Sequence, residues 1–135
     1  MDFRVGKKLI LLVYCMALQG CSVRNKVVVE EICGFKVKTK INFLEEHENW
    51  MFGGDGHKTT IYSINPENLN YILYNARLNN FEPFDNSNNP FPNYEIKPYI
   101  KNGRGLYKSI FEENVYKSVL IDSVNQKLIY SICIL

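Results

Sequence analysis

The stretch VYKSVLIDSVNQKLIYSICI, residues 115–134, decides the fold of this chain. Two runs rich in Val, Ile, Leu and Tyr, Val115–Asp122 and Lys127–Ile134, flank the polar link Ser123-Val124-Asn125-Gln126. This pattern predicts two strands joined as an antiparallel hairpin. Apolar residues fall on both faces of each strand, which is typical of strands at the centre of a sheet.

Shorter segments upstream also carry strand patterns. Gly105–Phe111 and Thr59–Ile64 are short runs of β-forming residues. From Phe35 to Phe43, apolar residues or Thr alternate with Lys36, Lys38, Lys40 and Asn42, which predicts a half-buried strand. Gly34 separates this segment from Val27–Cys33, which we expect to form a further strand and to pair with it.

Three lysines, Lys36, Lys38 and Lys40, would share one face of the strand over residues 35–43. Such a row is typical of a solvated face or of a protected sheet edge. A contact with an anionic partner or with lipid headgroups is the alternative.

One segment predicts a helix. Asn65 is a suitable N-cap, Pro66 suits the first turn, and the helix is expected to end near Asn79-Asn80. Its apolar face consists of Leu69, Ile72, Leu73 and Ala76. The fold class is therefore α+β: an antiparallel sheet of five or six strands with one helix packed on it, in a single domain over residues 27–135.

A long loop is expected over residues 81–98, which hold Pro83, Pro90, Pro92 and Pro98 and many Asn. Loops of this length often carry function. Its aromatic residues either line a binding surface or attach the loop to the core: Phe81, Phe84, Phe91, Tyr94 and the following Tyr99.

The segment from Glu45 to His57 holds both histidines, the single tryptophan and three glycines around Asp55. His47, Asp55 and His57 are candidate metal or ligand residues, because imidazole and carboxylate groups bind zinc and similar ions. Their spacing matches no known ligand motif, and the pair of histidines is not H-E-x-x-H. A glycine-rich hairpin turn with surface histidines is the favoured interpretation.

The same segment carries a resemblance. Together with the closing hairpin it resembles a group of small bacterial proteins that have a histidine, a Gly-Asp-Gly turn and a tyrosine-rich last hairpin. Trp50-Met51 departs from the glycines that the group has after its histidine. The resemblance implies a fold and no particular reaction. The matching residues are His47, Gly54, Asp55, Gly56, Asp122, Leu128 and Tyr130.

The first twenty residues have the pattern of a secretory leader. Arg4, Lys7 and Lys8 precede an uncharged run, Leu9–Leu18. That run makes a helix of about 15 Å, which is too short for the roughly 30 Å hydrocarbon core of a membrane. We therefore expect a leader that is removed, rather than a transmembrane helix.

The end of the leader, Leu18-Gln19-Gly20-Cys21, resembles the lipobox of bacterial lipoproteins. The resemblance implies cleavage between Gly20 and Cys21, and acylation of Cys21 with diacylglycerol and a further chain such as palmitate. Two or more chains anchor a protein stably. Residues 1–20 are then the signal peptide and residues 21–26 a short lipidated tether. With Ser22 in place of Asp after the cysteine, the resemblance also implies sorting to the outer membrane, facing the periplasm.

The formal net charge of +2 belongs to the leader. Of 16 Lys and Arg the leader holds three, and of 14 Asp and Glu it holds one, which leaves 13 of each. A neutral domain has no strong basic field, so we expect no nucleic-acid partner.

The four cysteines have different fates. From the lipobox resemblance, we expect Cys15 to leave with the leader and Cys21 to be acylated. Cys33 and Cys133 would then remain in an oxidising compartment, where a disulfide is allowed. The alternative is that they are two buried thiols.

Three functions fit these features. The first is a non-catalytic protein-binding module on the membrane, in one version an immunity protein that neutralises an envelope toxin. The second is an accessory lipoprotein for envelope structure or assembly. The third is a metal-dependent enzyme that uses residues 47–57. No nucleophile elbow or catalytic triad is visible, so we expect no enzyme and no cofactor besides the lipid on Cys21.

Overall fold

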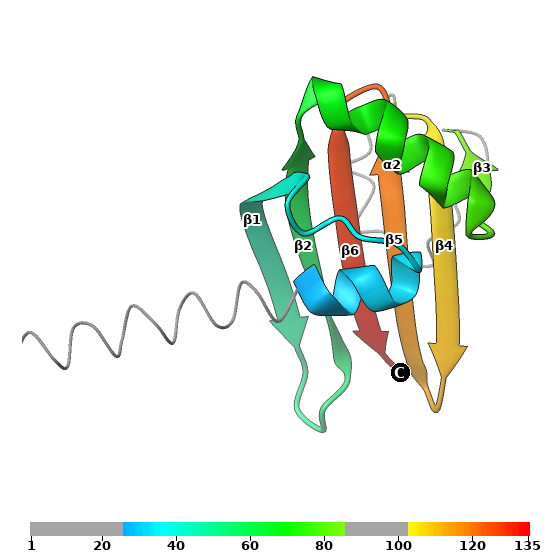
Figure 1. The fold of residues 1–135 in the computed structure, drawn as a ribbon. Helices are drawn as coiled ribbons and strands as arrows, with labels where there is room; N and C mark the ends of the chain where they lie inside the picture. The colour runs from blue at the N-terminus through cyan, green and yellow to red at the C-terminus, as the bar shows by residue number, and fades with distance from the viewer. Residues whose placement is uncertain (1–25, 86–102) are drawn as a thin grey trace, which may run out of the picture.

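A computed structural model of the chain describes residues 26–85 and 103–135. It contains one antiparallel sheet of six strands in the order β1-β2-β6-β5-β4-β3, with two helices on one of its faces (Figure 1). The predicted α+β fold with a helix packed on an antiparallel sheet is confirmed. The elements are a first helix with its described part over residues 26–33, β1 (Ile41–Trp50), β2 (Gly56–Ile64), α2 (Pro66–Leu78), β3 (Glu82–Phe84), β4 (Gly105–Glu112), β5 (Val115–Asp122) and β6 (Lys127–Ile134).

The closing hairpin forms with the predicted bounds, and its strands β5 and β6 lie at the centre of the sheet. Its turn is built by Asp122, whose Oδ1 accepts hydrogen bonds from the backbone N–H groups of Val124 and Asn125, each at 3.0 Å. The Oδ2 atom accepts a further bond from the Asn125 side chain at 2.8 Å. A carboxylate bonded to its own turn in this way is a common means of reversing the chain.

The helix α2 also forms as predicted. Asn65 occupies the N-cap position with an extended backbone, and Pro66 is the first helical residue. The apolar face lies on the core, with Ile72 and Ala76 buried and Leu69 and Leu73 partly buried against the same cluster.

The prediction of a strand over Val27–Cys33 is wrong, because this segment is helical. Its buried residues Val29, Ile32 and Cys33 have helical spacing and lie in the core. Gly34 ends the helix with φ of +80°, and its N–H donates to the carbonyl of Glu30 at 2.9 Å. Lys26, which the sequence places in the tether, is already part of this helix.

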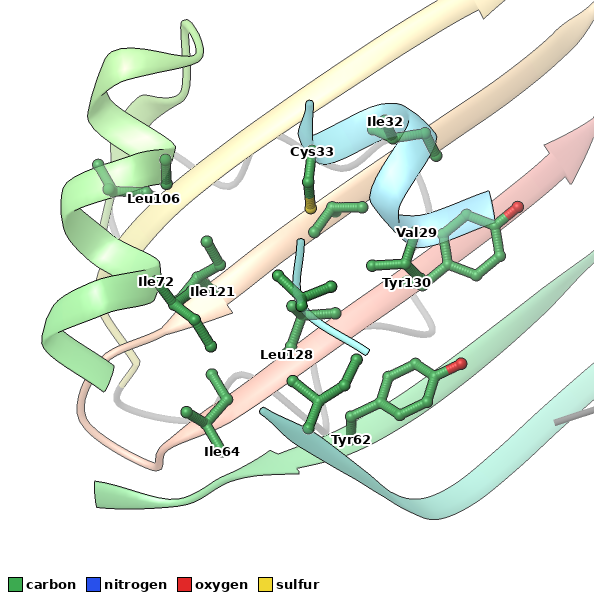
Figure 2. Packing of buried hydrophobic residues seen from close by; sticks show 14 of the residues in the cluster. Val29, Ile32, Cys33, Tyr62, Ile64, Ile72, Leu106, Ile121, Leu128 and Tyr130 are labelled. Atoms are coloured by element: carbon green, nitrogen blue, oxygen red, sulfur yellow. The ribbon is translucent and has the colours of Figure 1, made fainter. Parts of the chain in front are cut away.

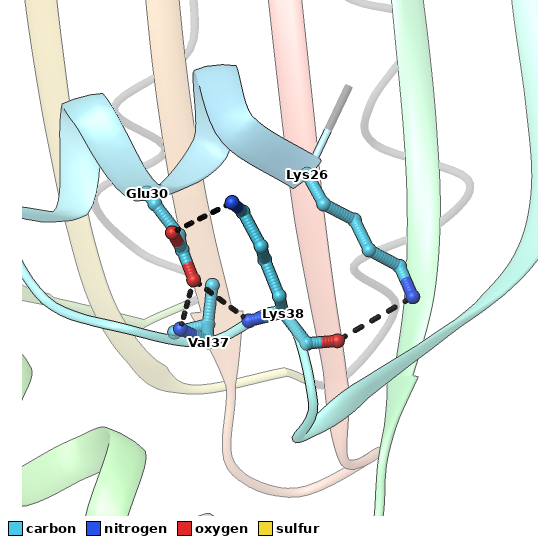
Figure 3. Close-up of polar contacts among 4 residues, drawn as sticks. All are labelled: Lys26, Glu30, Val37 and Lys38. Atoms are coloured by element: carbon cyan, nitrogen blue, oxygen red, sulfur yellow. Dashed lines mark hydrogen bonds and ion pairs between the residues drawn. The ribbon is translucent and has the colours of Figure 1, made fainter. Parts of the chain in front are cut away.

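The predicted strand over residues 35–43 is also wrong for most of its length, because β1 begins only at Ile41. Glu30 explains the difference (Figure 3). Its Oε1 accepts hydrogen bonds from the backbone N–H groups of Val37 at 2.9 Å and Lys38 at 3.0 Å, and Lys26 Nζ donates to the carbonyl of Ile41 at 3.2 Å. Side chains of the first helix therefore form the hydrogen bonds to this backbone that a neighbouring strand would otherwise form.

The lysine row expected on that segment does not exist as a strand face. Lys38 pairs with Glu30, with Nζ 3.6 Å from Oε2, and Lys40 lies over the ring of Tyr71 at 4.4 Å from its centroid. These lysines are held by contacts within the domain.

The main core lies between the sheet and the two helices (Figure 2). A second, smaller cluster is made by Ile61, Phe84, Leu120 and Ile129. Ile61, Leu120 and Ile129 alternate along their strands with residues of the main core. The two clusters therefore occupy opposite faces of the sheet, and β2, β5 and β6 are buried on both sides. This double burial fits their central positions.

Cys33 and Cys133 are buried thiols with no disulfide between them. Cys33 belongs to the main core, whereas Cys133 lies four residues after Ile129 on β6 and thus on the face of the second cluster. Because the sheet separates the two sulfur atoms, the disulfide alternative does not hold in this structure.

Candidate functional site

The hairpin of β1 and β2 is the part of the molecule that the sequence singled out. The two strands pair antiparallel from Ile41 opposite Ile64 to Trp50 opposite Gly56. The turn is closed by hydrogen bonds from the N–H of Met51 to the carbonyl of Asp55 at 2.7 Å and from the N–H of Gly54 to the carbonyl of Met51 at 3.3 Å. The favoured interpretation, a glycine-rich hairpin turn, is confirmed, although the strands extend further into the segment than expected.

The turn needs its glycines. Gly53 and Gly54 have φ values of +110° and +94°, which side chains with a Cβ rarely adopt. Gly56 has φ of +154°, and a Cβ there would collide with the backbone of Asn49 and Trp50. The Gly-Asp-Gly pattern therefore has a local conformational reason.

The candidate ligands His47, Asp55 and His57 do not come together as a metal site. His47 pairs with Thr59, His57 pairs with Asn49, and Asp55 lies in the turn. His47 Nε2 lies 3.3 Å from Glu45 Oε2, at an exposed position. Within residues 26–85 and 103–135, no three His, Cys, Asp or Glu side chains are grouped so that they could hold a metal ion.

The most unusual feature of the hairpin is the exposure of β1. Ile41 is buried, and the remaining nine residues of the strand are exposed. A register shift between Phe43 and Glu45 marks a bulge. Beyond it, Glu46, Glu48 and Trp50 lie on the face of the helices, and Glu45, His47 and Asn49 lie on the opposite face.

The strand β1 carries three glutamates and no Lys or Arg. Glu46 Oε1 lies 3.1 Å from Lys58 Nζ and accepts a hydrogen bond from Thr60 Oγ1 at 3.2 Å. Glu48 Oε2 accepts a hydrogen bond from the indole of Trp50 at 2.9 Å, at an exposed position. The strand thus presents a net negative charge to solvent.

The end of the hairpin presents three large apolar side chains in a row. The exposed fraction is 43% for Trp50 and 70% for Met51, and Phe52 is fully exposed. Figure 1 shows this end as the tip of the β1–β2 hairpin, away from both helices. We refer to Trp50, Met51 and Phe52 as the hairpin tip.

Two tyrosines and one cysteine of the core have raised pKa values and stay protonated at neutral pH. Burial raises the pKa of Tyr62 to about 12 and that of Tyr130 to about 12. Burial also raises the pKa of the Cys33 thiol to about 12. A thiol that stays protonated is a poor nucleophile, so Cys33 acts here as a small core residue.

A cavity of about 950 Å³ lies between the end of α2 and the strands β3 and β4. Leu73, Phe84 and Leu106 contribute apolar wall, and Arg77 and Arg104 are its basic residues. Its wall also includes Asp85 and Gly103, the residues on either side of segment 86–102.

Several predicted residues lie outside the described part of the chain. These are the leader, the cleavage site Gly20–Cys21, the lipidation site Cys21, and the aromatic residues Phe91, Tyr94 and Tyr99. The two aromatic residues of the loop that are described, Phe81 and Phe84, are buried in the main core and in the second cluster. For these two, attachment to the core is the interpretation that holds.

Comparison with known proteins found no matching family model, no matching curated protein and no matching solved structure. Of the helices in the described residues, none combines the length and the apolar character that a membrane crossing requires.

Sequence reasoning missed the exposed edge strand and the hairpin tip. The acidic run Glu45-Glu46-His47-Glu48 lacks the alternation of a half-buried strand, so the pattern does not predict that a strand extends through it. The useful signal was Trp50-Met51-Phe52 directly before Gly53-Gly54, because large apolar residues beside a tight turn have little core within reach.

Proposed function

We propose that this protein is a lipid-anchored, non-catalytic module of the bacterial cell envelope that binds another protein through the β1–β2 hairpin. The observation that carries the proposal is the hairpin tip, where three consecutive large apolar side chains are exposed next to an acidic strand. Exposed apolar groups of this size cost free energy in water and are typical of interaction sites.

The chemistry of the tip suits protein recognition. Aromatic residues, Trp above all, contribute most of the binding energy in many protein interfaces, and charged residues around them supply specificity. Glu48 provides a carboxylate beside Trp50 and accepts a hydrogen bond from its indole. The tip projects from the sheet, so a partner reaches it without displacing any described element.

The anchor is proposed from the lipobox resemblance. With an acylated Cys21, the five residues that end at Lys26 would span at most about 17 Å, and the first helix has begun by Lys26. The domain would therefore stay close to the outer membrane, on the periplasmic side, and its partner would be a protein that enters or resides in that compartment.

The two partner classes lead to different phenotypes. If the partner is a toxin delivered into the envelope, deletion of the gene makes cells sensitive to that toxin or to competing strains that deliver it. If the partner belongs to an envelope assembly, deletion weakens the envelope in the absence of any competitor.

The proposal is tested with the full chain, purified in non-ionic detergent and immobilised at its C-terminus. Wild type is compared with Trp50→Ser/Met51→Ser/Phe52→Ser, and with a control, Tyr74→Ser/Leu78→Ser, that removes exposed apolar side chains from α2. We expect one envelope protein to be retained by wild type and by the control, and to be lost with the tip variant. Equal retention by all three proteins would contradict the proposal.

A further inference from the structure

We propose that the outer edge of β1 accepts an extended, basic segment of the partner protein as an added strand, an inference that rests on the proposed function and names the partner's chemistry. Strand addition of this kind joins proteins through main-chain hydrogen bonds, while neighbouring side chains set specificity.

Among residues 26–85 and 103–135, no strand pairs with the outer edge of β1. β1 is a terminal strand whose strand neighbour is β2, and it is ten residues long. Every second residue of a terminal strand directs its N–H and C=O groups away from the sheet. Proteins usually keep edge strands short for this reason, and the other terminal strand, β3, has three residues. The long edge at β1 is the exception within this sheet.

The charge of β1 selects the kind of strand that pairs with it. Glu45, Glu46 and Glu48 are exposed, and β1 itself contains no Lys or Arg. Lys58 pairs with Glu46, and His47 lies 3.3 Å from Glu45. A second copy of this chain would place acidic strands side by side, which is unfavourable. A segment with Lys or Arg side chains would place opposite charges across the new strand pair, which is favourable.

Apolar side chains mark both ends of the acidic stretch. Phe43 and Leu44 are half exposed before it, and Trp50 stands at its end. The bulge between Phe43 and Glu45 interrupts the regular ladder, so the added strand would pair along Glu45–Trp50. At about 3.3 Å per residue these six residues span roughly 20 Å, the length of an ordinary strand.

Trp50 makes the proposal directly measurable, because it is the single tryptophan of the chain and lies at the end of this edge. The probe is a capped peptide of about eight residues that alternates Lys and Val, added to the full chain in dodecyl maltoside. We expect a saturable change in the tryptophan emission. A peptide with Glu in place of Lys should give no change.

Two comparisons separate strand addition from simple charge attraction. Two further peptides are N-methylated at every second peptide bond, one at the odd and one at the even positions, which removes the N–H donors from one edge of the strand and keeps its charge. The peptide whose methyl groups face β1 should bind about tenfold or more weakly. Glu46→Gln/Glu48→Gln, which removes the two carboxylates that share one face of β1, should weaken binding of the unmodified peptide by a similar factor. The matched control Glu112→Gln/Glu113→Gln, which removes two exposed acids at the β4–β5 turn, should leave it unchanged.

The proposal is overturned if the emission does not change up to about 1 mM peptide, the limit of weak binding. It is also overturned if both N-methylated peptides bind as tightly as the unmodified one, or if the control variant loses as much affinity as Glu46→Gln/Glu48→Gln. If the tryptophan emission changes with protein concentration in the absence of peptide, a second copy of the chain occupies the edge, and the proposal is overturned. Dependence of envelope-protein retention on the hairpin tip would in each case leave the proposed function standing.

Discussion

At the scale of single residues, Glu30 connects the first helix to the segment that follows it. Its carboxylate accepts two backbone hydrogen bonds and pairs with Lys38 (Figure 3). Burial opposes ionisation of Glu30, but the bonds from Lys38 and Val37 and the charge of Lys38 outweigh it and lower its pKa below the ordinary value of 4.5. The folded-state pKa is thus below the unfolded one. This stabilisation is present above about pH 4.5 and is lost as the pH falls through the folded-state pKa.

Replacement of Glu30 should therefore destabilise the fold. We expect Glu30→Ala to lower the free energy of unfolding by about 1–3 kcal/mol at pH 7, because two backbone donors lose their acceptor. The neighbouring Glu31→Ala, at an exposed position, should change it by less than about 0.5 kcal/mol. Urea unfolding measures both. An equal effect of the two substitutions would show that the Glu30 contacts do not stabilise the segment.

Tyr62 gives a prediction at alkaline pH. Its hydroxyl is buried without a hydrogen-bond partner among the described residues, and burial raises its pKa to about 12. The folded-state pKa is above the ordinary value of 10.0. The contribution of the buried, neutral Tyr62 to the free energy of unfolding is therefore complete below about pH 10, and it is lost as the pH rises toward 12.

We expect a spectrophotometric titration of the folded chain to show tyrosine ionisation near pH 12, and Tyr62→Phe to reduce the amplitude of that step. The substitution should leave stability at pH 7 unchanged or slightly higher, since it removes a buried group that makes no bond. A clear loss of stability at pH 7 would instead show that the hydroxyl has a partner.

Residues that act within a few positions of the chain could be predicted from the sequence. Asn65 and Pro66 start a helix, and the link after Asp122 forms a turn, because these effects depend on local backbone geometry. The contact of Glu30 with Val37 could not be predicted, because it requires the helix and the following segment to be placed first.

At the scale of elements, the first helix shows where propensity misleads. Val27-Val28-Val29 favours a strand by composition, but Val29, Ile32 and Cys33 also match helical spacing, and packing on the sheet decides between the two. The closing hairpin was predictable because both of its strands are buried on both faces, so composition and tertiary context agree.

The pairing of β4 with β5 depends on one glycine. A Cβ at Gly105 would collide with the backbone carbonyl of Ile121, so the two strands could not stay close enough for regular pairing. We expect Gly105→Ala to lower the free energy of unfolding by about 2–4 kcal/mol.

The control for this prediction is Gly53→Ala. Nothing lies within 4 Å of a Cβ at that position, although its φ of +110° is unfavourable for alanine. We expect a loss of about 1 kcal/mol there. Thermal unfolding of both variants measures the difference, and a smaller loss for Gly105→Ala than for Gly53→Ala would refute the close contact.

At the scale of the whole molecule, the lipid anchor and the fold of the domain can be tested separately. We expect Cys21→Ala to leave the precursor uncut and to abolish partition into the detergent phase, because the acyl chains supply the membrane affinity. The fold should be unchanged, since Cys21 lies before the described domain. Normal maturation and partition of this variant would contradict the lipobox interpretation.

The fold class and the central strands were predictable from periodicity, whereas the candidate site was not. His47 and His57 attracted attention as chemical groups, but the structure places them in two exposed or half-exposed strand positions without a metal-binding group among the described residues. The exposed edge of the same hairpin depends on β1 being a terminal strand of the sheet. The order of strands in a sheet cannot be derived from local sequence patterns.

The central claim, that the β1–β2 hairpin binds a protein in the envelope, is tested most directly by photo-crosslinking in intact cells. A photoreactive phenylalanine analogue replaces Phe52 at the hairpin tip or, as a control, Val124, an exposed apolar residue in the β5–β6 turn at the opposite end of the sheet. The account predicts a single protein adduct from position 52, lost with Trp50→Ser, and none from position 124. No adduct at position 52, or the same adduct from both positions, would contradict it.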